Sequence, residues 1–125
     1  MLVAKFSATD NAARAEITVS SFPGDVGGLL ANVNRWRQQV KLPAIDEADL
    51  PQAVSQVDLH DGKGSLVDLN GTDAKTGQKA RLVGVAVPHG GQTWFFKMLG
   101  DESVVAREKD AFLKFVQSVK YPNAP

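Results

Sequence analysis

The sequence predicts an α+β fold: a twisted antiparallel sheet of about six strands with helices on both faces, forming an α/β/α sandwich. Alternating apolar and polar residues predict two strands before residue 24 and four after residue 54. One helical pattern of apolar residues separates the two groups, and another follows them. We expect a single domain over residues 1–125, because nothing in the chain has linker composition.

The N-terminal strands are expected to pair as a hairpin. Residues 1–7 alternate, and turn-forming residues follow at positions 9–11. In the second strand Ala15, Ile17 and Val19 are apolar and the residues between them are polar. This alternation predicts one face on a core and one face in water.

The first helix is predicted after residue 24. Asp25 is the expected N-cap, since its carboxylate can accept from free amides of the first turn. Gly27 and Gly28 are poor helix residues and indicate close packing or exposed backbone. The buried stripe follows helical spacing and comprises Leu29, Val33, Trp36 and Val40. A short helical turn is expected over residues 46–50.

The later strands and the last helix complete the predicted sheet. Residues 81–87 are apolar on both faces, which is typical of a central strand. Residues 93–99 form its neighbour, and residues 70–78 form a polar loop. Asp101 or Ser103 caps the last helix. Its predicted buried side contains Val104, Val105, Glu108, Phe112, Phe115, Val116 and Val119, and its water-facing side contains Arg107, Lys109, Asp110 and Lys114.

Composition excludes several classes of function. Lysine plus arginine and aspartate plus glutamate each total 14, so the formal net charge is zero and a dedicated nucleic-acid binder is not expected. The chain has no cysteine, which excludes disulfides and thiolate chemistry. No apolar run approaches the roughly 20 residues that span a bilayer. Residues 1–6 alternate like a strand, so membrane association requires an anchor outside this sequence.

The polar side of the first helix is the main candidate binding surface. Arginine suits carboxylate contacts and interface anchoring. The candidate residues are Asn32, Asn34, Arg35, Arg37 and Gln38, joined by the loop at residues 70–78. The alternative is a solvated helix face on which the arginines pair with nearby acids.

Three further sites have weaker support. Trp36 and Trp94 are expected walls of an aromatic pocket, if one exists, although a central strand between helices also explains the aromatic run at residues 94–96. His60, Asp61 and His89 could bind zinc or copper if their turns meet, but the signal is weak and exposed turn residues are the favoured interpretation. The glycine-rich helix start at residues 24–28 could hold an anion, but it matches no nucleotide-binding motif.

The order of elements and the aromatic last helix resemble the PsbP-like superfamily. The resemblance covers nearly the whole chain and rests on Phe112-Leu113-Lys114-Phe115-Val116-Gln117-Ser118-Val119 and on the succession of strands. The segment from Gly27 to Arg37 is similar to one in small bacterial proteins that are often exported. The resemblance implies an adaptor or assembly role, and it assigns no functional residue.

We therefore expect a non-enzymatic binding or accessory module of a bacterial protein assembly, with a protein partner, no cofactor and no bound metal. The sequence favours an extracytoplasmic location over a cytoplasmic one and leaves the oligomeric state open. The alternative is a small-molecule or metal-binding protein that uses a cleft between helix and sheet. A structural domain of a larger membrane-anchored chain is a third interpretation.

Overall fold

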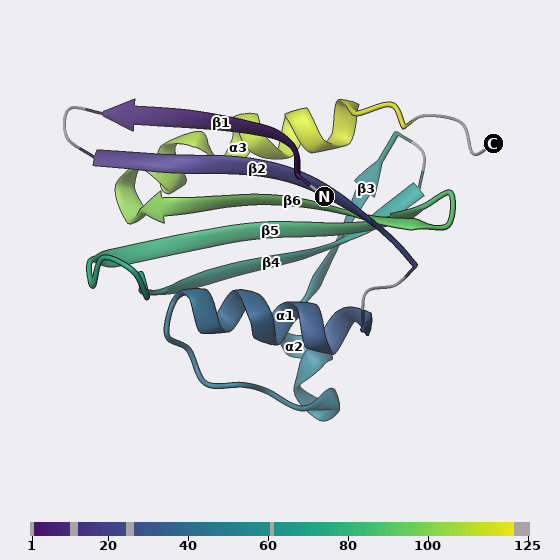
Figure 1. Ribbon diagram of the computed structural model, residues 1–125, viewed down its shortest axis with the longest axis horizontal. Helices are drawn as coiled ribbons and strands as arrows, with labels where there is room; N and C mark the ends of the chain where they lie inside the picture. Colours follow the sequence, from purple (N-terminus) through teal and green to yellow (C-terminus); the bar gives the residue numbers. More distant parts are fainter. Residues whose placement is uncertain (1, 11–12, 25–26, 61, 122–125) are drawn as a thin grey trace.

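The computed structural model describes residues 2–10, 13–24, 27–60 and 62–121 (Figure 1). Its six strands form one antiparallel sheet in the order β1-β2-β6-β5-β4-β3. The elements in chain order are β1 (Leu2–Asp10), β2 (Ala13–Pro23), α1 (Gly28–Gln39), the 3-10 turn η1 (Glu47–Asp49), α2 (Leu50–Ala53), β3 (Ser55–Leu59), β4 (Gly62–Thr72), β5 (Lys79–His89), β6 (Gln92–Asp101) and α3 (Glu102–Ser118). The predicted α+β class and antiparallel pairing are confirmed.

The N-terminal hairpin joins the four later strands through β2 and β6. Ile17 of β2 lies opposite Met98 of β6, and Val19 lies opposite Phe96. This pairing places β5 and β6 at the centre of the sheet, as their apolar composition predicts. The sheet is therefore continuous, and its two edges are β1 and β3.

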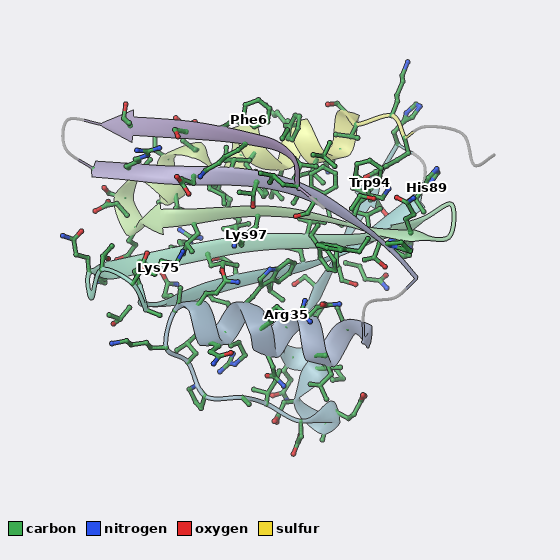
Figure 2. The ribbon with its side chains drawn as sticks, in the orientation of Figure 1. Phe6, Arg35, Lys75, His89, Trp94 and Lys97 are labelled. Carbon is green, nitrogen blue, oxygen red and sulfur yellow. The ribbon has the colours of Figure 1, made fainter. Side chains whose placement is uncertain are left out.

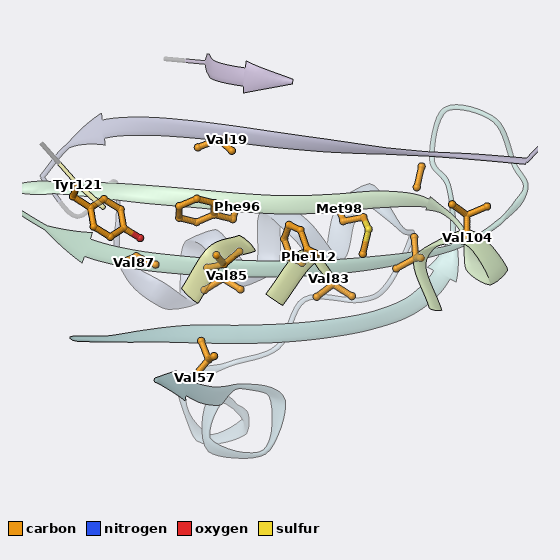
Figure 3. Packing of buried hydrophobic residues seen from close by; sticks show 13 residues of the cluster. Val19, Val57, Val83, Val85, Val87, Phe96, Met98, Val104, Phe112 and Tyr121 are labelled. Carbon is orange, nitrogen blue, oxygen red and sulfur yellow. The ribbon is translucent and has the colours of Figure 1, made fainter. Parts of the chain in front are cut away.

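The larger core lies between the sheet and α3 (Figure 3). On β5 it contains Val83, Val85 and Val87, whose side chains share one face because strand residues alternate. We call this face the α3 side. The core extends across the sheet from Val57 of β3 to Val19 of β2. Every strand thus contributes to the α3 side.

The second core lies between the sheet and α1. It uses the intervening β5 residues, and Trp36 covers Gly84, where an added Cβ would lie 2.7 Å from the indole ring. We call this face the α1 side. The buried members are Val33, Trp36, Val40, Val67, Leu69, Ala80, Leu82, Ala86 and Phe95. None of these described core residues belongs to β1 or β2.

The α1 side of the N-terminal hairpin is therefore left open. Ala15 and Val19 are 1% and 5% exposed on the α3 side. Thr18 and Ser20, which point the other way, are half-buried, and neither belongs to the core beneath α1. The predicted contrast between a core face and a water face is confirmed for Ala15 and Val19, whereas Ile17 is half-buried like the polar residues of the other face.

The start of α1 differs from the prediction. The N-cap is Gly27, with φ of 87°, and it makes no side-chain cap hydrogen bond. Gly28 follows with φ of 90°, so two residues in the left-handed region turn the chain into the helix. Asp25 lies outside the described residues, and the cap position itself is glycine rather than aspartate. The predicted cap of α3 is confirmed, because Asp101 accepts from the Ser103 amide.

Several boundary and burial predictions were wrong. The first strand does not end at residue 7, because β1 continues to Asp10. The polar loop predicted over residues 70–78 is shorter, because β4 continues to Thr72. Phe115 is 38% exposed rather than buried, although its ring packs edge-on against Phe6 at 6.1 Å. Lys109 is half-buried rather than exposed, and its Nζ donates to Asp68 at 2.8 Å.

Asp68 lies at the centre of a partly buried ion cluster on the α3 side. Arg81 donates to both carboxylate oxygens at 2.8 and 2.6 Å, and Lys109 of α3 adds the third bond. These hydrogen bonds, that of Arg81 foremost, lower the pKa of Asp68 against the opposing effect of burial. The cluster fastens α3 to β4 and β5.

Candidate functional site

The open part of the α1 side forms a cleft of about 620 Å³ between the sheet and the end of α1. Its floor comes from β2 and β6, and its wall comes from Gln39 and the turn at residues 73–78 (Figure 2). We call it the β2–β6 cleft. It is lined by Ala13, Arg14, Glu16, Thr18, Gln39, Asp73, Ala74, Lys75, Thr76, Gln78, Lys79, Ala80, Lys97, Leu99, Gly100 and Asp101.

The wall is built where the turn caps the C-terminal end of α1. The Thr72 amide donates to the Val40 carbonyl at 3.0 Å, and the Ala74 amide donates to the Gln39 carbonyl at 3.0 Å. Gly71 allows this approach, since an added Cβ would lie 2.2 Å from the Val40 oxygen. The helix carbonyls that would otherwise lack partners are thereby satisfied.

The turn is held in shape by Asp73. Its Oδ1 accepts from the amides of Lys75 and Thr76 at 2.7 and 3.2 Å. The Asp73 amide donates to the Gln78 carbonyl at 2.8 Å, and the Asp73 carbonyl accepts from the Gly77 amide at 2.8 Å. Gly77 has φ of 75°, which glycine adopts without strain. The turn therefore holds the backbone of Lys75 at the cleft wall.

Lys97 is the most unusual side chain of the cleft. It lies on β6 between Thr18 and Gly84 of the neighbouring strands, and its Nζ donates to Gln39 Oε1 at 2.8 Å. Burial lowers the pKa of Lys97, the charge of Lys75 lowers it further, and Glu16 opposes both. A half-buried ammonium with a neutral partner is costly unless an anion joins it.

The carboxylates of the cleft are already engaged. Glu16 pairs with Lys5 and Arg14, each at 3.4 Å, and Asp101 caps α3. Lys79 also lines the cleft, and it pairs at 3.0 Å with Glu102, which does not line it. Within the described ranges, neither Lys97 nor Lys75 has a carboxylate within ion-pair distance. The cleft thus holds two ammonium groups that have no ion-pair partner among the described residues.

Two asparagines of the predicted binding surface have structural roles instead. Asn32 is 3% exposed, donates to the Gly28 carbonyl at 2.8 Å and accepts from Arg35 at 2.9 Å. Asn34 donates to the Ile45 carbonyl at 2.9 Å and accepts from the Ile45 amide at 2.8 Å. Both amides are occupied in holding α1 and the segment after it, so they do not present free groups to a partner.

The other residues of that surface divide into two groups. Arg37 is half-buried, and its Nε donates to the Pro43 carbonyl at 2.7 Å. Arg35 and Gln38 are exposed, and Arg35 projects from α1 in Figure 2. They border a more open groove of about 500 Å³, lined by Ala31, Asn34, Arg35, Gln38, Leu42 and Ala44. The predicted surface therefore reduces to a groove with one exposed arginine.

The two tryptophans cannot line one pocket, because they lie on opposite faces of the sheet. Trp36 packs on the α1 side, edge-on to Phe95 at 5.9 Å. Trp94 packs on the α3 side, edge-on to Tyr121 at 5.3 Å. Both are parts of the cores, so the alternative of one pocket walled by both tryptophans is contradicted, and the favoured interpretation of the aromatic run as part of a central strand agrees with the two cores.

The histidines do not form a metal site with described residues. His89 stacks on Tyr121 at 4.6 Å, and His60 is exposed at the end of β3. Asp61, the third predicted ligand, lies outside the described residues. In the ranges that the structure covers, no three His, Asp or Glu side chains group as metal ligands. Those same ranges contain no helix with the length and apolarity needed to cross a membrane.

The sequence prediction missed Lys97 and Gln39, the centre of the cleft. A signal for Lys97 was present, because it shares a strand face with Phe95 and Leu99. A lysine among apolar residues on one face of a central strand is unusual, since lysine is rarely buried without a partner. Gln39 carries no such signal.

The described elements define an α+β protein built on one antiparallel sheet. No family model matches the chain, and no curated protein is similar to it at a significant level. A similar solved structure is that of PA94 from Pseudomonas aeruginosa, a protein of unknown function suggested to be a regulator. The two superpose with a TM-score of 0.63 and 16% identity, over 96% of this chain and 83% of PA94. At that identity the likeness shows the fold alone.

Proposed function

We propose that the protein is a non-enzymatic binding module whose ligand occupies the β2–β6 cleft. The observation that carries the proposal is Lys97, a half-buried ammonium on the cleft floor whose described partner is a neutral amide. The cleft volume of about 620 Å³ falls within the range of small-molecule sites, about 300–1,000 Å³. A ligand group that accepts from Lys97 would offset the cost of its burial.

The lining of the cleft supports binding rather than catalysis. Its described lining includes no histidine, serine or tyrosine. Lysine and threonine can also act as nucleophiles, but Lys97 donates to Gln39, and Thr76 accepts from the Gln78 amide. Its acids, among them Glu16 and Asp101, are occupied by ion pairs or by a helix cap. The packing of α1 and α3 against alternate residues of β5 also supports a PsbP-like sandwich. For a protein of this kind we propose an accessory role and an extracytoplasmic location.

A protein partner on the outer side of α1 is the second candidate. The observation that favours it is the groove beside exposed Arg35 and Gln38. Arginine at the border of a groove is a common interface anchor. This candidate differs from the first in position, because none of these residues lines the β2–β6 cleft.

A thermal-shift screen with blocking variants tests the first proposal and separates it from the second. The panel contains organic acids, sugars, nucleosides and acidic peptides. A ligand at a hundredfold excess over its Kd stabilises the native state by about 2.7 kcal/mol. Thr18→Trp fills the cleft and should abolish the shift, whereas the exposed control Ser118→Trp should retain it.

The response of the thermal shift to the two blocking variants assigns the ligand to one of the two sites. A shift that survives Thr18→Trp but disappears in Arg35→Glu supports the helix groove and contradicts the cleft. A shift that survives both blocking variants contradicts both sites. Absence of any shift across the panel contradicts the small-ligand proposal.

A further inference from the structure

We infer that the β2–β6 cleft binds a small organic monocarboxylate, with its carboxylate between Lys97 and Lys75 and its hydrocarbon part against Leu99 and Ala80. This inference rests on the proposed function and adds the ligand class. It is carried by the arrangement of charge in the cleft, because the two ammonium groups lack carboxylate partners among the described residues.

Lys97 provides the anchor for the carboxylate. A lysine ammonium has three donors, and one of them is used by Gln39 Oε1 at 2.8 Å. The remaining donors belong to a group that is half-buried on the floor of the cleft. A carboxylate there would form a charge-assisted hydrogen bond in a partly desolvated site, where such bonds are strong.

Lys75 provides a second positive charge from the opposite wall. Its backbone is fixed by the Asp73 turn, and its side chain is exposed. Figure 2 shows Lys75 at the turn and Lys97 on the sheet, and both line the cleft. The charge of Lys75 is close enough to lower the pKa of Lys97. An anion between the two groups would relieve this repulsion.

The rim favours a single negative charge over a polyanion. Glu16, Asp73 and Asp101 all line the cleft, and a phosphate ester or polyphosphate would bring added charge close to these carboxylates. Arg14, which could otherwise grip a phosphate with its guanidinium, is paired with Glu16. The cleft has no further arginine among its described lining residues.

The apolar part of the lining favours an organic acid over an inorganic anion. Leu99 and Ala80 lie on neighbouring strands on the same side as Lys97, and Ala74 of the turn also lines the cleft. The volume exceeds what a bare carboxylate needs. A short alkyl or aryl group would bury apolar surface there, at about 25 cal/mol per Å².

An NMR titration with hexanoate and benzoate tests the inference, using hexanamide and benzamide as uncharged controls. The acids should shift the Lys97 side-chain signals and the amides of Gln39 and Lys75, and the neutral compounds should not. Lys97→Met should weaken hexanoate binding about tenfold, the effect of one lost charge-assisted bond. Lys75→Met should weaken it less, and Lys114→Met, which removes an exposed charge on α3, should leave it unchanged.

Three results would overturn the inference. The first is equal binding of hexanamide and hexanoate, and the second is unchanged hexanoate binding in Lys97→Met. The third is binding of inorganic phosphate or pyrophosphate, included as a separate arm, in preference to the acids. In each case, a thermal shift by another ligand that Thr18→Trp abolishes would still support the binding-module proposal. Failure of the monocarboxylate inference can therefore be told apart from failure of the proposed function.

Discussion

The half-buried cluster around Asp68 and the half-buried Lys97 lie on opposite faces of the same sheet, and they differ in how their positive charge is balanced. On the α3 side, Arg81 and Lys109 converge on Asp68. On the α1 side, the described partner of Lys97 is the amide of Gln39. In the first cluster both cations are paired with a carboxylate, and the cluster holds α3 against the sheet. Lys97 has donors to spare, which is the condition expected of a binding site before its ligand arrives.

The two faces of the sheet also differ in how much of each is covered by a core. The α3-side core draws residues from every strand, from Val57 to Val19. The α1-side core stops at β6, so Thr18 forms part of an open cleft instead. A sheet covered completely on one face can leave part of the other face free for a ligand without losing its main core.

The largest expected effect is a difference in stability between substitutions on the two faces of one strand, β6. Met98 is fully buried on the α3 side, and Leu99, its neighbour, is half-buried at the cleft. Met98→Ala should cost about 2–5 kcal/mol, because it leaves a cavity in the core. Leu99→Ala should cost about 1 kcal/mol, because it removes partly exposed surface. Urea denaturation of the two variants measures the difference, and equal costs would show that the cleft face is as well packed as the core.

The next largest effect on stability concerns the packing of α1 against the sheet. An added Cβ at Gly84 would lie 2.7 Å from the Trp36 ring. Gly84→Val should therefore destabilise the fold by about 3 kcal/mol through overpacking. Trp36→Leu should make room, so the double variant should cost less than the sum of the two single changes. Strict additivity in denaturant titrations would mean that Trp36 is not what restricts position 84.

The ion cluster on the α3 side should show its charge in the pH dependence of stability. The bond from Arg81, and then that from Lys109, lowers the pKa of Asp68 below its ordinary value of 3.8. A carboxyl with a lowered pKa stabilises the fold above the unfolded value, and this contribution is lost as the pH falls through the folded value. Asp68→Asn should cost about 1–2 kcal/mol at pH 7, because two cations lose their counter-charge.

Thermal unfolding across acid pH checks that prediction. The gap between wild type and Asp68→Asn should narrow below pH 3.8, the ordinary value of the carboxyl pKa. Asp110→Asn, an exposed change on α3, serves as the control and should stay within about 0.5 kcal/mol. A gap that is independent of pH would assign the role of Asp68 to shape rather than charge.

The sequence pattern was sufficient for the framework of the fold. Strict alternation at Ala15, Ile17 and Val19 predicted the half-covered strand that became the cleft floor. Helical spacing predicted the α1 stripe from Leu29 to Val40. These features are local, because apolar residues that repeat every two positions in a strand, or every 3.6 in a helix, mark the buried face of that element.

The site could not be predicted in the same way, because it joins residues that are distant in the chain. Lys97 and Gln39 are 58 positions apart, and their contact depends on the strand order of the folded sheet. Polar residues on a helix do not reveal whether they face water or brace a loop. Asn34 resembled a free surface residue in the sequence but clamps Ile45 in the structure.

The smallest effect tests the cleft itself through the stability of Lys97→Met. Burial, first among the causes, lowers the pKa of Lys97 below 10.5. Between the lowered value and 10.5 the unfolded state binds more protons, so wild-type stability rises with pH in that window. Below the window the full cost of the buried charge is present. Lys97→Met should therefore stabilise the apo protein at pH 7 by about 0.5–1 kcal/mol.

That gain should shrink as the pH rises towards 10.5, whereas Lys114→Met should show no such trend. Chemical denaturation at about pH 7 and about pH 10 measures both variants. Destabilisation by Lys97→Met at every pH would mean that the bond to Gln39 contributes more than the burial of charge costs. Lys97 would then be a structural brace like Asp68, and the contrast between the two faces would fail. A stabilised variant that also loses hexanoate binding would show instead that the protein keeps a costly charge in place for its ligand.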